Sequence, residues 1–477
     1  MITLSQKRYF INPGDMDLKD IEEEMLGDSV LSKLSALACQ ERISLFLVGG
    51  YLRDLLLGIR RKDYDLALAE EAASFIPRIE ETLQFRFFKI GKEEAGTVTY
   101  RISKKDLSVD LTLFQGGTIN PDLQRRDFTI NAIAFSLRDR RFHWVEGALE
   151  DIEERVIRVA SARSIDQDPL RMLRAIRYSS ALDGFRIDPP LKQEILRKKE
   201  LIRRIPGERI KMELDQILLS PRPGDGLKLL HEVSLLFTLF PELKGLESLG
   251  PNEYHHLNVL SHILLMIEKC QWALEWCIHN GSPLSLTPED RLVLSYATLF
   301  HDLGKQETYS QDEKGRVHFY HHETFSAKVA EAIMERLRFS NTLKDQILRI
   351  IRNHMRILNL SEETKETALK RLVHHMGDPT PLLVLHTLAD KEASRGILSF
   401  SRDEVIENHC LRILELFQHQ EIVHPPPLIS GHDVMRLGHP PGPKVGEILK
   451  AIRNKQVMGE INTREEALQI LGEKFSP

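Results

Sequence analysis

The most informative pattern of hydrophobic and polar positions lies in residues 45–68. An apolar run is followed by two glycines, by a short segment with leucines at helical spacing, and by a basic turn. A second extended run then begins at Asp63. This order predicts a strand, a glycine turn, a helix and a second strand. Because successive side chains of a strand point to opposite faces, Asp63 and Asp65 are expected to share one polar face.

A second alternating run, within KKDLSVDLTLF at residues 104–114, carries Asp110 on its polar face. If this strand lies beside the first one, Asp110 adds a third carboxylate to Asp63 and Asp65; otherwise it faces water at the edge of a sheet. Carboxylates on one face repel each other unless a cation lies between them, and Mg²⁺ is a cation that takes oxygen ligands. The two runs therefore predict a magnesium site.

Two further features are typical of phosphate binding. Gly49 and Gly50 follow the first predicted strand and carry no side chain that would keep backbone N–H groups from a phosphate. The adjacent Arg125 and Arg126 fit phosphate oxygens through their guanidinium groups, although a lone pair of arginines is usually a solvated surface. Phosphate-binding glycines beside metal-binding carboxylates indicate chemistry on a nucleoside triphosphate.

Longer motifs connect these features to a known family. GGYLRDLLLG and KDYDLAL, within residues 49–68, resemble the first motif of the class II nucleotidyltransferases, the branch of tRNA CCA-adding enzymes and bacterial poly(A) polymerases. RRDFTINA, which begins at Arg125, resembles the second motif. The resemblance implies a site with two Mg²⁺ ions, of which Asp63 and Asp65 are ligands, and a catalytic set of three carboxylates: Asp63, Asp65 and Asp110. It implies a nucleotide-binding set: Gly49, Gly50, Arg53, Arg125, Arg126, Asp168, Arg171, Arg174 and Arg177.

The resemblance also implies how the base is selected, because Asp168 and Arg171 match the D-x-x-R part of the family's base-reading motif. The carboxylate accepts from the amino group of C or A, and the guanidinium donates to the ring nitrogen. U and G would place a carbonyl oxygen against the carboxylate, and unpaired polar groups are costly. The sequence departs from the motif at Gln167, where the family has an acid. Asp168 and Pro169 also predict a helix start, with Asp168 as the cap and Pro169 as the first helical residue.

Composition and charge limit the possible partners. The chain has 477 residues and a formal net charge of −5, so RNA must bind to local basic patches. No apolar run is long enough to span a membrane, and the N-terminus lacks the apolar region of a signal peptide. The four scattered cysteines form no zinc motif and suit a reducing cytoplasm. The predicted RNA-binding patch consists of basic residues: Arg197, Lys198, Lys199, Arg203, Arg204 and Lys211.

The second half of the chain turns helical after the Pro- and Gly-rich segment 220–226. Six of its residues resemble the ligand set of HD-type phosphohydrolases: His262, His301, Asp302, His322, His354 and Asp390. Imidazole and carboxylate ligands suit a transition metal such as Ni²⁺ or Mn²⁺. The resemblance implies a metal-dependent phosphatase or phosphodiesterase, or an inactive remnant that serves as a scaffold.

We predict an α+β protein with a mixed-sheet nucleotidyltransferase head at 30–146 and a helical neck at 147–220. An HD body at 221–423 and a tRNA-binding helical tail at 424–477 follow. The predicted reaction is the template-independent addition of C and A from CTP and ATP to the 3′ end of tRNA. A poly(A) polymerase, a CC-only or A-only enzyme, and an HD phosphohydrolase with a sensor head remain alternatives. The oligomeric state is left open.

Overall fold

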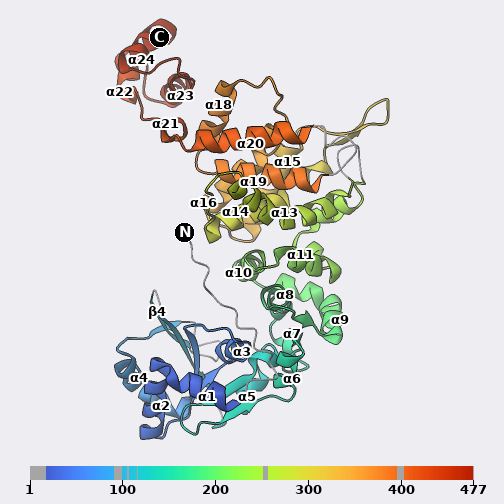
Figure 1. Ribbon diagram of the computed structural model, residues 1–477, viewed down its shortest axis with the longest axis vertical. Coiled ribbons are helices and arrows are strands. Elements are labelled where there is room, and N and C mark those ends of the chain that lie inside the picture. The colour runs from blue at the N-terminus through green and yellow to red at the C-terminus, as the bar shows by residue number, and fades with distance from the viewer. Residues whose placement is uncertain are drawn as a thin grey trace. The chain divides into compact units, whose positions relative to one another are not determined.

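The computed structural model describes residues 18–90, 99–104, 107–114, 117–250, 256–394 and 402–475. The chain divides into two compact units, Met1–Ile205 and Pro206–Pro477. The first unit contains a mixed sheet with helices, and the second is mostly helical (Figure 1). The predicted α+β class is confirmed. Within the described ranges, no helix combines the length and apolar character needed to cross a membrane.

The sheet of the first unit brings together strands that are distant in sequence. Seven strands lie in the order β3-β4-β5-β2-β1-β6-β7. Neighbours β2 and β5 run parallel, whereas the other neighbouring pairs are antiparallel. A separate parallel pair joins β8 to β9. The strands are β1 (Leu45–Val48), β2 (Asp63–Ala69), β3 (Phe88–Ile90), β4 (Thr99–Lys104), β5 (Leu107–Phe114), β6 (Ile133–Ser136), β7 (Phe142–Trp144), β8 (Val156–Ile157) and β9 (Arg186–Ile187).

The helices of the first unit begin and end with recognisable signals. The Asp28 side chain caps α2 by accepting from the backbone N–H groups of Val30 and Leu31, at 2.8 and 3.0 Å. Pro77 lies in the first turn of α4, where the missing N–H costs little. The helices are α1 (Leu18–Gly27), α2 (Ser29–Glu41), α3 (Gly50–Leu56), η2 (Glu70–Phe75), α4 (Ile76–Leu83), α5 (Asn120–Gln124), η4 (Thr129–Asn131), α6 (Ala148–Glu153), α7 (Ser164–Gln167), α8 (Arg171–Ala181), α9 (Pro189–Lys198) and η5 (Lys199–Arg204).

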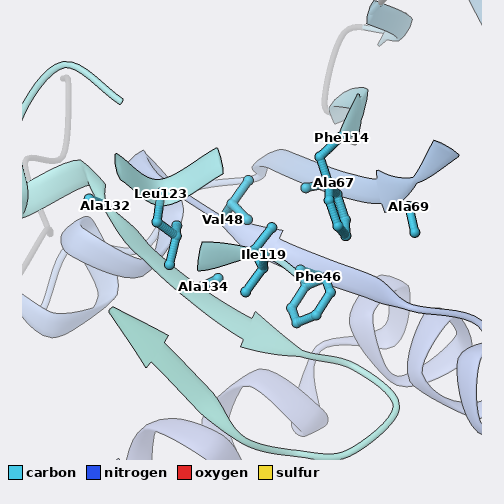
Figure 2. Packing of buried hydrophobic residues seen from close by; sticks show 9 residues of the cluster. All are labelled: Phe46, Val48, Ala67, Ala69, Phe114, Ile119, Leu123, Ala132 and Ala134. Carbon is cyan, nitrogen blue, oxygen red and sulfur yellow. The ribbon is translucent and has the colours of Figure 1, made fainter. Parts of the chain in front are cut away.

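The two faces of the sheet differ in chemistry, as the alternation in β2 and β5 predicts. One face carries large buried side chains, among them Tyr64 and Leu111. The other face starts with the aspartates of β2 and β5 and continues into a small apolar cluster (Figure 2). The cluster consists of buried residues: Phe46, Val48, Ala67, Ala69, Phe114, Ile119, Leu123, Ala132 and Ala134. Packing of this cluster anchors one end of the strands, while the carboxylates stay at the other end.

The start of α8 differs from the prediction. Asp168 and Pro169 precede the helix, which begins at Arg171. The Asp168 carboxylate accepts from the N–H of Leu170 at 3.2 Å, two residues ahead, and so closes a local turn instead of capping the helix. Asp168 also ends the short helix α7. The turn between the two helices places the start of α8 two residues later than predicted.

The second unit is a set of packed helices with one hairpin, β10–β11. The long helices α13 and α19 pack against each other, and Tyr296 of α14 donates to Asp215 of α10 at 2.7 Å. The elements are α10 (Gly207–Leu218), α11 (Pro223–Glu232), α12 (Leu235–Leu239), η6 (Pro241–Glu247), α13 (Val259–His279), α14 (Pro288–Phe300), η7 (Leu303–Lys305), β10 (Tyr309–Gln311), β11 (Val317–Phe319), α15 (His322–Arg336), α16 (Asn341–Asn353), α17 (Met355–Leu358), α18 (Glu366–Met376), α19 (Thr380–Ala393), α20 (Asp403–Phe417), α21 (Gln420–Val423), α22 (Gly431–Arg436), α23 (Pro443–Val457) and α24 (Arg464–Lys474).

The last helices form their own apolar cluster, which includes Ile448 and Leu471. Thr463 and Glu466 form a reciprocal capping box at the start of α24, so this part of the chain has a defined helix end. By its contacts α10 belongs to the second unit, although its sequence lies in the segment 147–220. The finer four-part division stays a prediction.

The four cysteines are free. Cys39 lies exposed on α2, whereas Cys277 and Cys410 are buried in the second unit. Burial raises the pKa of Cys270 and of Cys277 to about 12.

Candidate active site

The sheet brings the three predicted carboxylates together on one face. In the parallel pairing of β2 and β5, Asp65 lies directly opposite Asp110. Asp63 is two residues before Asp65 on the same face of β2, opposite Ser108. The two strands are therefore neighbours in the sheet, although residues 70–106 of the chain lie between them.

The electrostatics of Asp65 show how crowded this face is. Desolvation by the surrounding protein raises the pKa of Asp65 to about 6. Arg126 and Arg53 lower it, while the Asp110 and Asp63 carboxylates raise it further. Three oxygen-donor groups on one face, of which two destabilise the charge of Asp65, fit a hard divalent cation such as Mg²⁺.

Asp110 has a protein partner as well. Arg101 of β4 lies opposite Asp110 in the antiparallel pairing of β4 and β5. Its Nε donates to Oδ1 at 2.6 Å, and its Nη2 donates to Oδ2 at 2.5 Å. Arg101, Asp110 and Asp65 thus form one row across three neighbouring strands.

Gly49 makes room for an arginine beside the carboxylates. Its φ is +75°, and an added Cβ would lie 2.7 Å from Nη1 of Arg126 and 3.6 Å from Oδ2 of Asp65. The N–H of Gly49 donates to the carbonyl of Ile133 at 3.0 Å. Gly49 therefore contributes space rather than the phosphate-facing N–H that we expected of it.

A cavity of about 290 Å³ opens between β2, α3 and α8. Four guanidinium groups but only two carboxylates occur in its lining, so the wall favours an anion although the whole chain is acidic. Within the described part of the chain, the buried Nε atoms of Arg126 and Arg171 have no acceptor. Buried donors are normally paired, which indicates a ligand rich in acceptor oxygens. The lining residues are Gly49, Gly50, Arg53, Asp65, Arg126, Asp127, Asn131, Arg171, Arg174 and Tyr178.

Arg53 is the most firmly held of these arginines. Its Nε and Nη2 donate to Oδ1 of Asp54 at 2.8 and 2.6 Å, and its Nη1 donates to Oδ1 of Asn131 at 2.6 Å. The guanidinium also stacks over the Tyr178 ring, 5.0 Å from the centroid. Asn131 in turn donates to Asp127 at 2.9 Å. A buried network therefore joins α3 to α8 through the second motif.

The predicted base-reading residues make backbone contacts here. The Nη2 of Arg171 donates to the carbonyl of Arg125 at 2.6 Å, and its Nη1 donates to Oγ of Ser164 at 2.8 Å. Burial lowers the pKa of Arg171. The side chain of Asp168 closes the turn before α8, as described above. Arg171 thus holds the segment of the second motif against the start of α8.

Of the other predicted nucleotide-binding residues, Arg174 lines the cavity and Arg125 and Arg177 do not. Arg174 lies 3.6 Å from the Asp127 carboxylate at the cavity wall. Arg125, Asp168 and Arg177 are not part of the described cavity lining, and Arg177 stacks on Tyr178 at 4.6 Å. Sequence reasoning missed Tyr178. Its position seven residues after Arg171 on α8 is the signal that points it toward the same side of the helix.

Acidic side chains already pair with several basic residues of the predicted RNA-binding patch. Lys198 contacts Asp166 at 2.7 Å and Glu194 at 2.8 Å, and Lys211 contacts Asp215 at 2.5 Å. Arg203 pairs with Glu200 at 2.8 Å. Arg197 and Arg204 are exposed on α9 and η5 and Lys199 is half-buried. Helical spacing could have indicated the pairs with Glu194, Glu200 and Asp215, whereas the contact of Lys198 with Asp166 depends on the fold.

The second unit gathers the six predicted HD-type residues, which come from helices α13, α15 and α19, from the turn after α14 and from the turn between α16 and α17. Five of them lie in two overlapping groups that share Asp302: His262, His301 and Asp302, and Asp302, His322 and His354. Asp390 of α19 lies 3.2 Å from Nε2 of His262. His322 and His354 approach through their Nε2 atoms at 3.1 Å.

Backbone carbonyls orient three of these imidazoles. The Nδ1 atoms of His301, His322 and His354 lie 2.9, 2.9 and 2.7 Å from carbonyl oxygens three residues earlier. Donation by Nδ1–H leaves the Nε2 lone pairs directed at the centre of the group, as in metal-binding histidines. Burial lowers the pKa of His354 to about 3, which keeps it neutral and able to bind a metal.

Two buried residues of this group were not predicted. Lys305, in η7, contacts Asp302 at 2.7 Å. His386 is fully buried with its ring 5.0 Å from that of His301, and its nitrogens have no hydrogen-bond partner in the described part of the chain. Its spacing of four residues before Asp390 on α19 is the signal that could have found it. A cavity of about 610 Å³ adjoins the group and is lined in part by the β10–β11 hairpin.

Family comparisons agree with this architecture. Family models match residues 45–158 ("Poly A polymerase head domain"), 184–246 ("Probable RNA and SrmB- binding site of polymerase A") and 309–471 (tRNA nucleotidyltransferase domain 2). A solved Thermotoga maritima CCA-adding enzyme, complexed with tRNA, shares the fold with a TM-score of 0.60 and 22% identity over 95% of this chain and 97% of that one. The fold and the carboxylate site thus define a polymerase-type nucleotidyltransferase.

Two curated relatives specify the family. The A-adding tRNA nucleotidyltransferase of Deinococcus radiodurans is 32% identical over 88% of this chain and 93% of its own length. The CC-adding tRNA nucleotidyltransferase of Thermus thermophilus is 33% identical over 89% and 92%. The chain belongs to the tRNA nucleotidyltransferase family. The predicted enzyme class, an RNA nucleotidyltransferase, is confirmed by this membership.

Proposed function

We propose that the chain adds C and A to the 3′ end of tRNA from CTP and ATP and releases pyrophosphate. The observation that carries the proposal is the pairing of Asp65 with Asp110 beside a cavity lined by arginines. We also infer that Mg²⁺ is the working cation and that the enzyme acts in the cytoplasm, where tRNA maturation would require it.

The residues of the head have distinct roles in this reaction. Asp63, Asp65 and Asp110 would hold two Mg²⁺ ions, which lower the pKa of the RNA 3′ hydroxyl and offset the charge of the departing pyrophosphate. Arg126 and Arg53 bind the triphosphate oxygens, and Gly49 leaves the space that Arg126 occupies. The network through Asn131 keeps Arg53 in one orientation and so fixes the phosphate relative to α8.

Base selection remains with Asp168 and Arg171. In the structure both side chains bind backbone groups, so an incoming base must compete with those contacts. A C or A offers Arg171 an acceptor and Asp168 a donor, which replaces the lost hydrogen bonds. U and G leave the carboxylate facing an oxygen, and the exchange is unfavourable.

The decisive experiment uses tRNA transcripts that end before CCA, after the first C, and after CC. Each is incubated with labelled CTP, ATP or both, with Mg²⁺. We expect complete CCA ends, and a loss of roughly a thousandfold or more in rate for Asp65→Asn, because the cation contributes several kcal/mol. Asp139→Asn, which changes an exposed carboxylate of the β6–β7 turn, is the control.

Each other product pattern would replace the proposal. Long A tails without C would indicate a poly(A) polymerase. Addition of only CC, or of only A to a CC end, would indicate one of the partial activities that the two relatives carry in their names. Full activity of Asp65→Asn would show that the carboxylates take no part in the reaction.

We also propose a second function, metal-dependent phosphohydrolysis, in an HD-type centre of the second unit. It is favoured by the three imidazoles whose Nδ1 atoms face backbone carbonyls and whose Nε2 atoms converge on Asp302. This donor set fits Ni²⁺ or Mn²⁺, and a bound metal would supply an activated water for a phosphate ester. Lys305 and the adjoining cavity would bind the phosphate group.

The second function is separable from the first. With Ni²⁺ or Mn²⁺, we expect phosphate release from 2′-phosphorylated nucleotides and opening of 2′,3′-cyclic nucleotides. Asp302→Asn should abolish this hydrolysis and lower bound metal, measured by elemental analysis, while nucleotide addition continues. Asp63→Ala should abolish nucleotide addition and leave this hydrolysis unchanged. A purified protein that binds no transition metal at this centre would show that it is a scaffold.

A further inference from the structure

In the row Arg101–Asp110–Asp65, the guanidinium of Arg101 is a positively charged group of the protein that lies beside the carboxylates. Arg101 occupies both oxygens of Asp110, at 2.6 and 2.5 Å. Each oxygen of a carboxylate has two lone pairs, and a bidentate guanidinium takes one from each. A divalent cation that binds Asp110 must therefore share it with a positive group at hydrogen-bond distance.

Arg101 is placed so that it can leave. Its side chain is 43% exposed, compared with 6% for Arg53, which Asp54 and Asn131 enclose. An ion pair with such exposure is weak, because water solvates the released guanidinium. Asp110 is less exposed, at 23%, and lies on a strand between two others, so the carboxylate stays when the arginine moves.

We propose that Arg101 is a built-in counter-ion that occupies Asp110 in the absence of metal and is displaced as the divalent cation binds. Arg101 is then a positioning residue that acts through Asp110. The proposal rests on the proposed function in one respect, because it takes Asp110 to be a metal ligand. Two consequences follow: the free protein binds the cation more weakly than its carboxylates alone would, and the released guanidinium can meet a phosphate that arrives with the cation.

The test measures Mn²⁺ binding to the full chain by electron paramagnetic resonance of free Mn²⁺, without nucleotide or RNA. Arg101→Met keeps most of the side-chain stem and removes the charge. We expect its dissociation constant for Mn²⁺ to fall about three- to tenfold, the range of a partly exposed ion pair. Arg138→Met is the matched control, because Arg138 also holds a carboxylate, that of Asp139, at 3.0 and 2.9 Å.

The double variant Arg101→Met/Asp110→Asn distinguishes Mn²⁺ binding at Asp110 from Mn²⁺ binding to the second unit. The gain in affinity should vanish in this double variant relative to Asp110→Asn alone. A gain that persists there would place the effect elsewhere and overturn the proposal. Unchanged or weaker binding by Arg101→Met would also overturn it, since weaker binding would mean that Arg101 orients Asp110 for the cation.

A second variant guards against misfolding. Arg101→Lys keeps the charge but cannot take both oxygens, so it should raise Mn²⁺ affinity by a smaller factor; no rise would count against the proposal. Addition of a non-hydrolysable nucleoside triphosphate should strengthen Mn²⁺ binding more in the wild type than in Arg101→Met. Nucleotide addition is not a readout here, so failure of tRNA extension with the Mn²⁺ result intact would refute the proposed function alone.

Discussion

Gly49→Ala is the substitution whose effect the geometry defines best. The new Cβ would lie 2.7 Å from Nη1 of Arg126, whereas carbon and nitrogen atoms normally stay about 3.5 Å apart. The guanidinium must therefore move by roughly 1 Å. The φ of +75° adds backbone strain of about 1–2 kcal/mol for alanine. Gly49→Ala thus combines strain with displacement of a phosphate-binding group.

Gly117→Ala separates these two effects. Gly117 has a φ of +67°, and nothing lies within 4 Å of an added Cβ. Both variants should lose about 1–2 kcal/mol of stability in urea unfolding, because both strain the backbone. Only Gly49→Ala should weaken binding of CTP and ATP, by about 10- to 100-fold, the value of one hydrogen bond to a charged group.

The assay is calorimetric titration of the full chain with a non-hydrolysable triphosphate, beside urea unfolding of the same preparations. A folded Gly49→Ala protein with wild-type nucleotide affinity would refute the assignment of Arg126 to the triphosphate. An equal loss of affinity in Gly117→Ala would show that backbone strain, and not the displaced guanidinium, is responsible.

Three further predictions test other parts of the molecule. Asp54→Ala leaves the buried Arg53 guanidinium without its carboxylate and should cost about 3–5 kcal/mol in urea unfolding, so a loss below about 1 kcal/mol would contradict this account. In metal-free protein, burial lowers the pKa of His354 from 6.5 to about 3. The unfolded state alone takes up this proton below pH 6.5, so stability should fall by up to about 1.4 kcal/mol per pH unit toward pH 3, and His354→Asn should flatten the slope. Arg204→Gln should weaken tRNA binding and reduce its salt dependence by about one unit, more than Lys198→Gln, whose ammonium already contacts two carboxylates; equal effects would count against the difference.

The head could be predicted from its sequence because local patterns carry most of the information there. Alternation in β2 and β5 defines which face holds Asp63 and Asp110, and the glycines mark the turn before α3. Only the resemblance favoured a common site for the aspartates of the two strands, since no local pattern defines which strands become neighbours. The parallel direction of the pairing was not predicted. Arg101 was missed for the same reason: its contact with Asp110 depends on the register of β4.

The second unit shows a different limit. The resemblance named His262, His301 and Asp390, which are distant in sequence, because the motif order is known in a family. His386 has no place in that motif, and only the packing of α19 against α13 and α14 buries it beside the others. The contact of Lys198 with Asp166 likewise depends on the fold, whereas its contact with Glu194 follows from helical spacing.

The distribution of the four thiols has a practical consequence. At neutral pH a limiting amount of maleimide should react at Cys39 in preference to the buried sulfurs, whose pKa values lie far above that of the solution. A fluorophore or spin label could therefore be attached to the head of the natural sequence without first removing the other cysteines. Such a reporter, placed on α2, would allow substrate-dependent changes in the head to be followed in the unaltered enzyme.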